Sequence, residues 1–360
     1  MSHPLRQHMP NVVYECTTRT IQGRYLMRPS VQLRRRMIGI LCAAHELYPM
    51  VQLYAFAVLS NHWEFLASCE CAEEFSLYVG YVNSNFAREC SRAHGWTGPF
   101  WSRRVRIIPC LDDAATIDRL RYCIAQGVKE GLVDSPLEWP GATAVPALVG
   151  DMTLVGERID RHAMRRARAA AHRREAHSDE VHEATYTCET TLRLAPLPAF
   201  RRFDAATLRC RHVELLADVV AMATVERQGC PSLGLHAILS QDPHAAPANF
   251  IPTPAPLCHA SSAPIRRAFL RLRSAFTAAY RSVADAIAAL ISPRQQRLAA
   301  DAWPTDAAMS RGALPTLVED RHLRELQTQV PPGMFLQPRI IRSAHSSLLV
   351  DLSYAGLADG

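Results

Sequence analysis

The stretch VQLYAFAVLSNHWEFL, residues 51–66, predicts two β-strands that follow one another closely. Residues 51–59 are almost continuously apolar, as is typical of a central strand. Asn61 favours a turn or bulge, after which the strand pattern resumes over residues 62–68. The stretch therefore predicts the middle of a β-sheet, with a short polar interruption between its two strands.

The second strand brings two candidate metal ligands together. Side chains alternate between the faces of a strand, so His62 and Glu64 project to one side while Trp63 and Phe65 point into the core. A lone histidine on an apolar strand is more often a packed residue than a ligand. Glu64 changes this interpretation, because a carboxylate among apolar neighbours needs a cation or a donor to offset its desolvation. One imidazole with oxygen ligands suits Mg²⁺ or Mn²⁺.

The sequence around this stretch predicts an α+β fold. The order of expected elements, β-α-β-β-α-β-α, is that of a ferredoxin-like antiparallel sheet with helices packed on one face, and a mainly helical C-terminal region follows it. The expected elements are a strand at 12–20, a helix at 29–47, strands at 51–59 and 62–68, a helix at 72–94, a strand at 105–110 and a helix at 112–130.

Composition divides the chain further. Seven arginines lie between Arg158 and Arg174, a run that favours a solvated helical face, with phosphate binding as the alternative. Residues rich in Pro, Gly and Ala precede it, and a Pro-broken stretch closes the chain. The predicted parts are a nuclease-like domain at 1–150, a basic linker or helix at 151–185, a mainly helical domain at 186–300 and a loosely ordered tail at 301–360.

Length, charge and cysteine usage limit the classes of protein. The 360 residues carry 40 Lys plus Arg against 34 Asp plus Glu, and this net charge of +6 is compatible with a polyanionic partner without requiring one. Eleven cysteines without a Cys-x-x-Cys pair favour reduced thiols over disulfides or a zinc finger. No signal core or uninterrupted apolar span is found, so we expect a cytoplasmic protein with no membrane contact.

A second pair of polar side chains lies on the last predicted helix of the first domain. Positions four apart are neighbours on a helix, so Tyr122 and Gln126 point the same way. The helical wheel places them opposite the apolar stripe, which makes Tyr122 either an ordinary surface tyrosine or a functional one. If the stripe packs on its own sheet, the tyrosine serves the site of a partner subunit instead.

These residues together permit one chemistry. A tyrosine oxygen attacks a phosphodiester, a metal withdraws charge from the non-bridging oxygens, and a covalent phosphotyrosine forms with release of a hydroxyl. The covalent bond conserves the energy needed for rejoining, so no nucleotide cofactor is required, and the sequence has no P-loop.

An aromatic and basic segment, residues 96–106, is a candidate groove for single-stranded nucleic acid. Aromatic faces stack on unpaired bases and guanidinium groups hold phosphates. The alternative is a hydrophobic loop anchored on the core and followed by a solvated basic strand. The side chains concerned are Trp96, Phe100, Trp101, Arg103, Arg104 and Arg106.

With these motifs, the chain resembles the single-tyrosine HUH transposases, in particular the REP-associated tyrosine transposase group and its longer bacterial relatives with a C-terminal extension. The resemblance covers about residues 10–150. It rests on Asn61-His62-Trp63-Glu64, on Phe100-Trp101-Ser102-Arg103-Arg104, on Tyr122 to Gln126 with Gly131-Leu132-Val133, and on Thr18 to Tyr25. Further motifs like those of the longer relatives are Leu194 to Pro198, Gln241 to His244 and Pro256 to His259.

The resemblance implies functional roles. His62, Glu64 and Gln126 would hold Mg²⁺ or Mn²⁺, and Tyr122 would nick single-stranded DNA near hairpins through a 5′-phosphotyrosine. It also implies a homodimer, with the tyrosine helix acting in cis or in trans, in a bacterial, nucleoid-associated setting. The residues expected to contact DNA are Arg19, Arg24, Trp96, Phe100, Trp101, Arg103, Arg104, Arg106 and Lys129.

Glu64 departs from the family pattern, which usually has histidine at this position. Glutamate ligates Mg²⁺ or Mn²⁺, yet its negative charge weakens the metal as a Lewis acid toward phosphate. Three hypotheses follow: a working metal-dependent nuclease and strand transferase, a domesticated protein that binds hairpin or single-stranded DNA without cleaving it, and an interaction protein whose C-terminal helices recruit a host factor.

Overall fold

A computed structural model describes residues 7–173, 181–247, 255–300, 334–337 and 351–354. The chain separates into two compact units, one of Pro10–Ala263 and the other of Met1–Met9 with Pro264–Gly360, and each is described by itself. The boundary predicted at residue 150 falls inside the first unit. The predicted tail, residues 301–360, lies outside the described residues except for two short strands.

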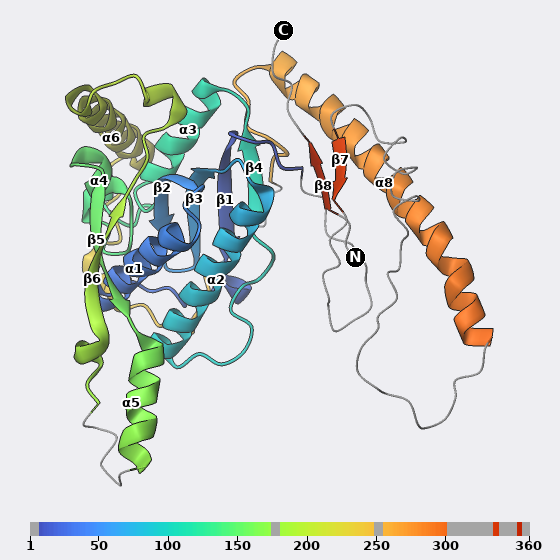
Figure 1. Cartoon of the computed structure of the whole chain (residues 1–360). Coiled ribbons are helices and arrows are strands. Elements are labelled where there is room, and N and C mark those ends of the chain that lie inside the picture. The colour runs from blue at the N-terminus through green and yellow to red at the C-terminus, as the bar shows by residue number, and fades with distance from the viewer. Residues whose placement is uncertain (1–6, 174–180, 248–254, 301–333, 338–350, 355–360) are drawn as a thin grey trace. The chain divides into compact units, whose positions relative to one another are not determined.

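The first unit is built around a four-stranded antiparallel sheet (Figure 1). Its strands are β1 (Val13–Arg19), β2 (Gln52–Val58), β3 (His62–Ser68) and β4 (Arg106–Cys110), in the order β2-β3-β1-β4. Every neighbouring pair is antiparallel. Because helices follow β1 and β3, this is the β-α-β-β-α-β arrangement that the sequence predicted, and the α+β class is confirmed.

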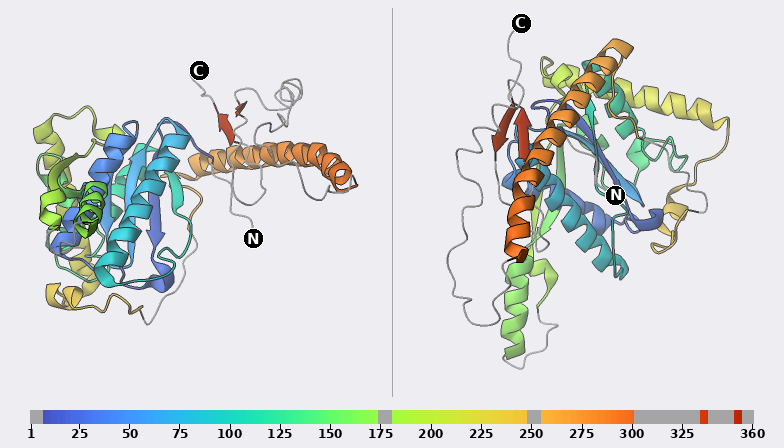
Figure 2. Two further views of the ribbon diagram at one scale, coloured as in Figure 1. Left: turned by 60° about the horizontal axis from the view of Figure 1, so that its bottom comes forward. Right: turned by 90° about the vertical axis from the view of Figure 1, so that its right-hand side faces the viewer.

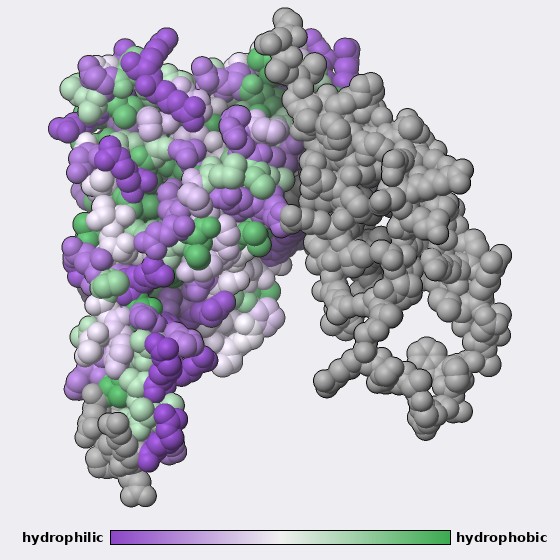
Figure 3. Space-filling model, viewed as in Figure 1, coloured by the Kyte–Doolittle hydropathy of each residue, from purple (hydrophilic) through white to green (hydrophobic). Residues whose placement is uncertain are grey.

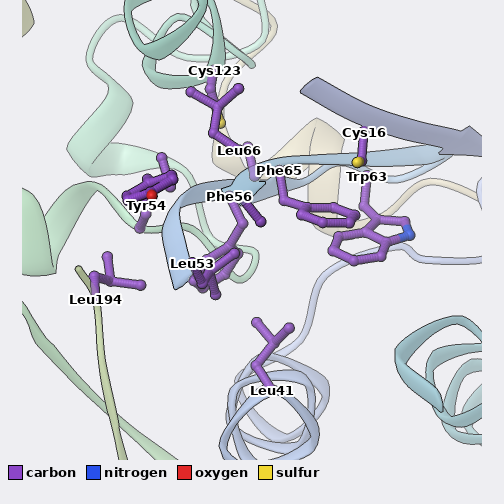
Figure 4. Packing of buried hydrophobic residues seen from close by; sticks show 14 of the residues in the cluster. Cys16, Leu41, Leu53, Tyr54, Phe56, Trp63, Phe65, Leu66, Cys123 and Leu194 are labelled. Atoms are coloured by element: carbon purple, nitrogen blue, oxygen red, sulfur yellow. The ribbon is translucent and has the colours of Figure 1, made fainter. Parts of the chain in front are cut away.

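Helices cover both faces of this sheet, which corrects the prediction that they pack on one. Helices α1 (Val31–Leu47) and α2 (Ala72–His94) lie on the face that carries the rings of Trp63 and Phe65 (Figures 1 and 2). Helix α3 (Asp113–Ile124) lies on the other face, and Figure 4 shows its Cys123 above the strands and Leu41 of α1 below them. Apolar side chains on both faces of β3 make this sandwich favourable.

Helix α3 is shorter than predicted. Asp112 caps its start by accepting the backbone N–H of Ala115 at 2.8 Å. The helix ends at Ile124, whereas the apolar pattern predicted an end near residue 130. Tight turns replace the last part, with Gly127 at φ +84° and Gly131 at φ +66°, conformations that favour glycine.

A two-stranded sheet packs against α1. Its strands are β5 (Thr153–Ile159) and β6 (Thr187–Arg193), and their contact with α1 is close enough that a Cβ on Gly156 would lie 2.4 Å from the backbone nitrogen of Gly39. The arginine-rich helix, α5 (Arg161–Arg173), follows β5. The predicted basic helix therefore begins only at Arg161, because the residues before it are β-branched and alternate as a strand.

The remaining elements are short or helical. In the first unit they are η1 (Ile21–Gly23), η2 (Pro136–Glu138), α4 (Val145–Val149), η4 (Glu183–Tyr186), η5 (Pro198–Phe200), α6 (Ala205–Arg227) and α7 (Leu235–Leu239). The second unit contains α8, which begins at Ala263 and ends at Ala300, with an antiparallel pair, β7 (Met334–Gln337) and β8 (Asp351–Tyr354). Hydrophilic residues are spread over the coloured face in Figure 3, with scattered hydrophobic ones between them. Within the described part of the chain, no helix is both long and apolar enough to cross a membrane.

Candidate active site

The α3 face of β3 carries the two predicted metal ligands. His62 lies opposite Arg19 of β1, and Glu64 lies between Thr17 of β1 and Ala57 of β2. On the other face, Trp63 and Phe65 are fully buried and their rings stack at a centroid distance of 4.4 Å, so the predicted alternation is confirmed. His62 and Glu64 therefore share one surface, beneath α3.

His62 is held in a form that can bind a metal. Its Nδ1 lies 2.8 Å from Asn61 Oδ1. Because an amide oxygen only accepts, Nδ1 donates its proton and Nε2 keeps a free lone pair. Burial, helped by the nearby positive charges of Arg19 and Lys129, lowers the pKa of His62 to about 3. The imidazole is thus neutral at physiological pH.

Glu64 is a buried carboxyl without full hydrogen bonding. It is 4% exposed, and its Oε1 has no hydrogen-bond partner. Burial, with a further contribution from the nearby Glu15, raises the pKa of Glu64 to about 8. An unsatisfied buried carboxyl oxygen costs about 1–3 kcal/mol or more. This cost is avoided when a cation or one of its waters binds the oxygen.

Gln126 completes the set from the turn after α3. The helical wheel placed it opposite the apolar stripe, but the structure buries it, because α3 ends at Ile124 and the positive φ of Gly127 turns the chain inward. Its amide is near enough to act on the pKa of both His62 and Glu64 as a hydrogen-bonding neighbour, although neither amide atom reaches full hydrogen-bond geometry with them.

The donor set fits a small hard cation. It offers one neutral imidazole, one carboxyl group that binds a cation once it has lost its proton, and one amide oxygen. The orphaned oxygens, Glu64 Oε1 and Gln126 Oε1, are atoms that a Mg²⁺ or Mn²⁺ ion would satisfy. No group of three or more His, Cys, Asp or Glu side chains suited to a metal occurs among the described residues, so the amide is needed for a third protein ligand.

Tyr122 lies in the last turn of α3, half-buried among cations. Lys129 Nζ donates a hydrogen bond to its hydroxyl at 2.6 Å, and the guanidinium carbon of Arg119 lies 4.7 Å from the ring centre. Lys129 also lowers the pKa of both His62 and Glu64 through its charge, so within one chain it lies near the ligand set as well as the phenol. Whether the phenol acts in cis or in trans stays a prediction.

Two further residues of the site were missed by the sequence analysis. Glu15 of β1 accepts a hydrogen bond from His259 Nε2 at 2.6 Å, and its other oxygen lies 3.5 Å from the guanidinium of Arg119. The segment of His259 pairs with the end of β4, through its own N–H to Pro109 at 2.8 Å. The Pro256 to His259 motif was the only signal in the sequence, and it did not indicate a partner.

The aromatic residues predicted to stack on bases do not all have a free face. Phe100 is 6% exposed and belongs to the core, where its ring packs edge-on against Trp101 at 4.7 Å, so it offers little surface for stacking on a base. Trp101 is half-buried and donates its indole N–H to the backbone oxygen of Asn83 at 3.1 Å. Trp96 is half-buried, with the guanidinium of Arg24 5.5 Å from its ring.

The predicted basic contacts remain accessible. Arg103, Arg104 and Arg106 are exposed, and no ion pair of these three is found within the described part of the chain. Arg106 lies in the same cross-strand row as Glu64, with Thr17 of β1 between them. The edge of the sheet beside the candidate ligands is therefore positively charged.

The Gln241 to His244 motif bonds to the segments that follow β1 and β2 and to the end of α2. Ser60 Oγ donates to Gln241 Oε1 at 2.9 Å, and His244 Nε2 donates to the backbone oxygen of His94 at 2.8 Å. The backbone oxygen of His244 accepts from Arg24. This later motif thus has a structural role beside the first-domain loops.

Destabilisation by Glu64 at high pH is the first testable consequence. The folded pKa of about 8 lies above the ordinary 4.5, so the contribution of Glu64 to stability is fully present below pH 4.5 and is lost as pH rises through 8. In chelator-treated protein, Glu64→Gln should remove this loss, which is at most roughly 5 kcal/mol at about 1.4 kcal/mol per pKa unit. Urea unfolding at pH 5 to 8.5 measures it, with the exposed Glu70→Gln as the matched control. Equal pH slopes in both variants would contradict the assignment.

Comparisons with known proteins find similar structures. No protein-family model and no curated protein matches the sequence. The chain is similar to a REP-associated tyrosine transposase solved with a REP hairpin, at TM-score 0.36 and 17% identity, over 41% of this chain and 86% of that one. It is also similar to a protein of Deinococcus radiodurans R1 provisionally assigned as a transposase, at TM-score 0.25 and 14% identity, over 34% of this chain and 95% of that one. The similarity to the first of these structures thus covers about two fifths of this chain.

Proposed function

We propose that the Pro10–Ala263 unit is a metal-dependent nuclease and strand transferase that acts on single-stranded DNA with Tyr122 as its nucleophile. The observation that carries the proposal is the convergence of His62, Glu64 and Gln126 beneath α3, with two of them carrying unsatisfied buried polar atoms. Buried polar atoms are usually hydrogen-bonded within the protein, so unsatisfied oxygens beside the unprotonated nitrogen of a neutral imidazole support a bound ligand at this place.

Each residue of the site has its own role in the proposed reaction. His62 Nε2, Glu64 and Gln126 would hold Mg²⁺ or Mn²⁺, and the chemistry that such an ion supplies is withdrawal of charge from the non-bridging oxygens of a phosphodiester. Asn61 fixes the tautomer of His62. Tyr122 supplies the attacking oxygen at the end of α3, where the neighbouring Arg119 favours an anionic substrate.

The product would be a covalent 5′-phosphotyrosine and a free 3′-hydroxyl. The bond to Tyr122 retains the phosphodiester energy, so strand transfer to another 3′-hydroxyl needs no nucleotide. Exposed arginines at the β4 edge are suited to hold the strand backbone. The test is incubation with a set of hairpin-flanked single strands and Mg²⁺ or Mn²⁺. A covalent protein–DNA adduct would support the proposal, and the absence of an adduct with every strand of a broad set would contradict it.

A second candidate function is binding of hairpin or single-stranded DNA without cleavage. The buried Glu64 favours this function, because burial and the nearby Glu15 disfavour the ionised form of Glu64 that would bind a metal. Adduct yields measured with wild type and Glu64→His decide between the two functions.

Under our first proposal, Glu64→His should speed adduct formation severalfold, since a neutral imidazole leaves more positive charge on the metal than a carboxylate does. Salt-sensitive binding with no adduct from either protein would establish the binder.

A further inference from the structure

Lys129 makes a direct contact with the hydroxyl of Tyr122. Its Nζ lies 2.6 Å from the phenolic oxygen and 3.8 Å from the ring centre. The backbone N–H groups of Val128 and Lys129 both bond to the oxygen of Ala125, which fixes the turn that follows α3. The turn that buries Gln126 therefore also brings Lys129 back over Tyr122.

The ammonium of Lys129 stays charged in this position. Burial acts to lower the pKa of Lys129, but the hydrogen bond to Tyr122 and the charge of the phenolate, together with Glu130 at 3.2 Å, outweigh it, so that the pKa is raised. Arg119 lies on the same phenol ring. A negative charge formed on the phenolic oxygen would therefore meet one hydrogen-bonded cation and a second one nearby.

Lys129 is the single lysine of the chain. The other 39 of its 40 Lys plus Arg residues are arginine. An ammonium is a compact point charge with three donors, whereas a guanidinium is a larger planar fork. The hydroxyl of Tyr122 thus lies beside the one lysine ammonium group of the sequence.

We propose that Lys129 is a catalytic residue that orients the Tyr122 hydroxyl and stabilises its phenolate, an inference that rests on the proposed function. In the forward step the bond from Tyr122 Oη to phosphorus forms as the bond from phosphorus to the 3′ oxygen breaks. The phenolic proton passes to solvent and the leaving 3′ oxygen takes a proton from solvent, so charge and protons balance. In the reverse step a 3′-hydroxyl gives its proton to solvent as its oxygen attacks phosphorus, and the phenolate leaves beside the ammonium and takes a proton from solvent.

A DNA-contact role for Lys129, as the sequence suggested, has different consequences. Loss of a phosphate contact weakens binding and lowers its salt dependence. Loss of a group that stabilises developing charge on the reacting oxygen slows the chemical step at saturating DNA. Measuring DNA affinity and the rate at saturating DNA in one Lys129 variant therefore distinguishes a DNA contact from stabilisation of the phenolate.

The experiment compares wild type with Lys129→Met and Lys129→Arg, with the exposed Arg104→Met as control. Lys129→Met should slow adduct formation on saturating oligonucleotide on the order of 100-fold, with unchanged DNA affinity and salt dependence. Lys129→Arg should recover part of the rate because it keeps a charge, and Arg104→Met should weaken binding instead. A Lys129→Met protein with the wild-type rate and weaker binding would overturn this inference alone. A wild type that forms no adduct would overturn the proposed function and this inference with it.

The contact also has a readout besides activity. Reductive methylation with ¹³C-formaldehyde labels Lys129 as the sole lysine side chain, in the full chain. Its resonance should shift in Tyr122→Phe and not in Tyr81→Phe, which alters a half-buried tyrosine of α2. A resonance that both variants leave unchanged would show that Lys129 does not contact the phenol.

Discussion

Tyr122→Phe is expected to abolish covalent attachment of single-stranded DNA, with a loss on the order of 10⁴-fold or more. The substitution removes one oxygen atom and leaves the ring in place over which Arg119 lies. The fold should be unaffected, because Tyr122 is half-buried and its hydroxyl bonds to the side chain of Lys129 rather than to the core. Adduct formation on a denaturing gel measures the effect, and DNA affinity should stay within a few-fold of wild type.

The matched control for this variant is Tyr81→Phe. Tyr81 is a half-buried tyrosine on α2, which covers the opposite face of the sheet. Its hydroxyl has no place in the proposed reaction, so this variant should form the adduct at the wild-type rate. Adduct formation by Tyr122→Phe at that same rate would exclude Tyr122 as the nucleophile.

His62→Ala is expected to weaken Mn²⁺ binding by about 100-fold or more and to remove metal-dependent cleavage. His62 is the one nitrogen donor of the proposed set, and its pKa of about 3 means that no proton competes with the metal at neutral pH. Even outer-shell partners of such ligands are worth about 10–100-fold in affinity. Isothermal titration with Mn²⁺ measures the change.

His45→Ala is the control for loss of a buried histidine. His45 lies on α1, where burial lowers its pKa to about 4 and its ring packs edge-on at 5.7 Å from Tyr78. It should lower thermal stability without changing Mn²⁺ affinity. Equal Mn²⁺ affinity in wild type and a folded His62→Ala protein would rule out His62 as a ligand.

Local patterning was enough to predict the sheet and half of the site. The two-residue period of β3 separates His62 and Glu64 from Trp63 and Phe65 whatever the rest of the chain does. The alternation of strand and helix patterns likewise predicted the element order. These features depend on near neighbours in sequence, which is why the sequence alone could predict them.

The buried position of Gln126 could not be predicted in the same way. A helical wheel assumes that the helix continues, and the apolar stripe of α3 does continue as far as Val128, which is buried. The positive φ at Gly127 breaks the helix within that stripe and reverses the direction of the amide. A glycine inside a helical pattern was thus the signal for a turn.

Contacts between distant segments were beyond any local pattern. Glu15 and His259 are 244 positions apart, yet their side chains meet at 2.6 Å. The burial of Phe100 depends on pairing of its segment with the residues just after β1, seen in the bond from Ile21 N–H to its backbone oxygen at 2.7 Å. The later motifs of the sequence therefore acquire a role only once the fold brings them onto the first-domain loops.

The most direct test of the central claim is to locate the DNA on the protein. Trypsin cuts after Arg121 and Lys129, so Tyr122 is the sole tyrosine of the peptide YCIAQGVK, residues 122–129. After incubation with a hairpin-flanked single strand and Mn²⁺, then nuclease trimming, mass spectrometry should find a 5′-linked nucleotide on this peptide and none after chelation. A nucleotide on any other residue, or a metal-independent adduct, would contradict the account.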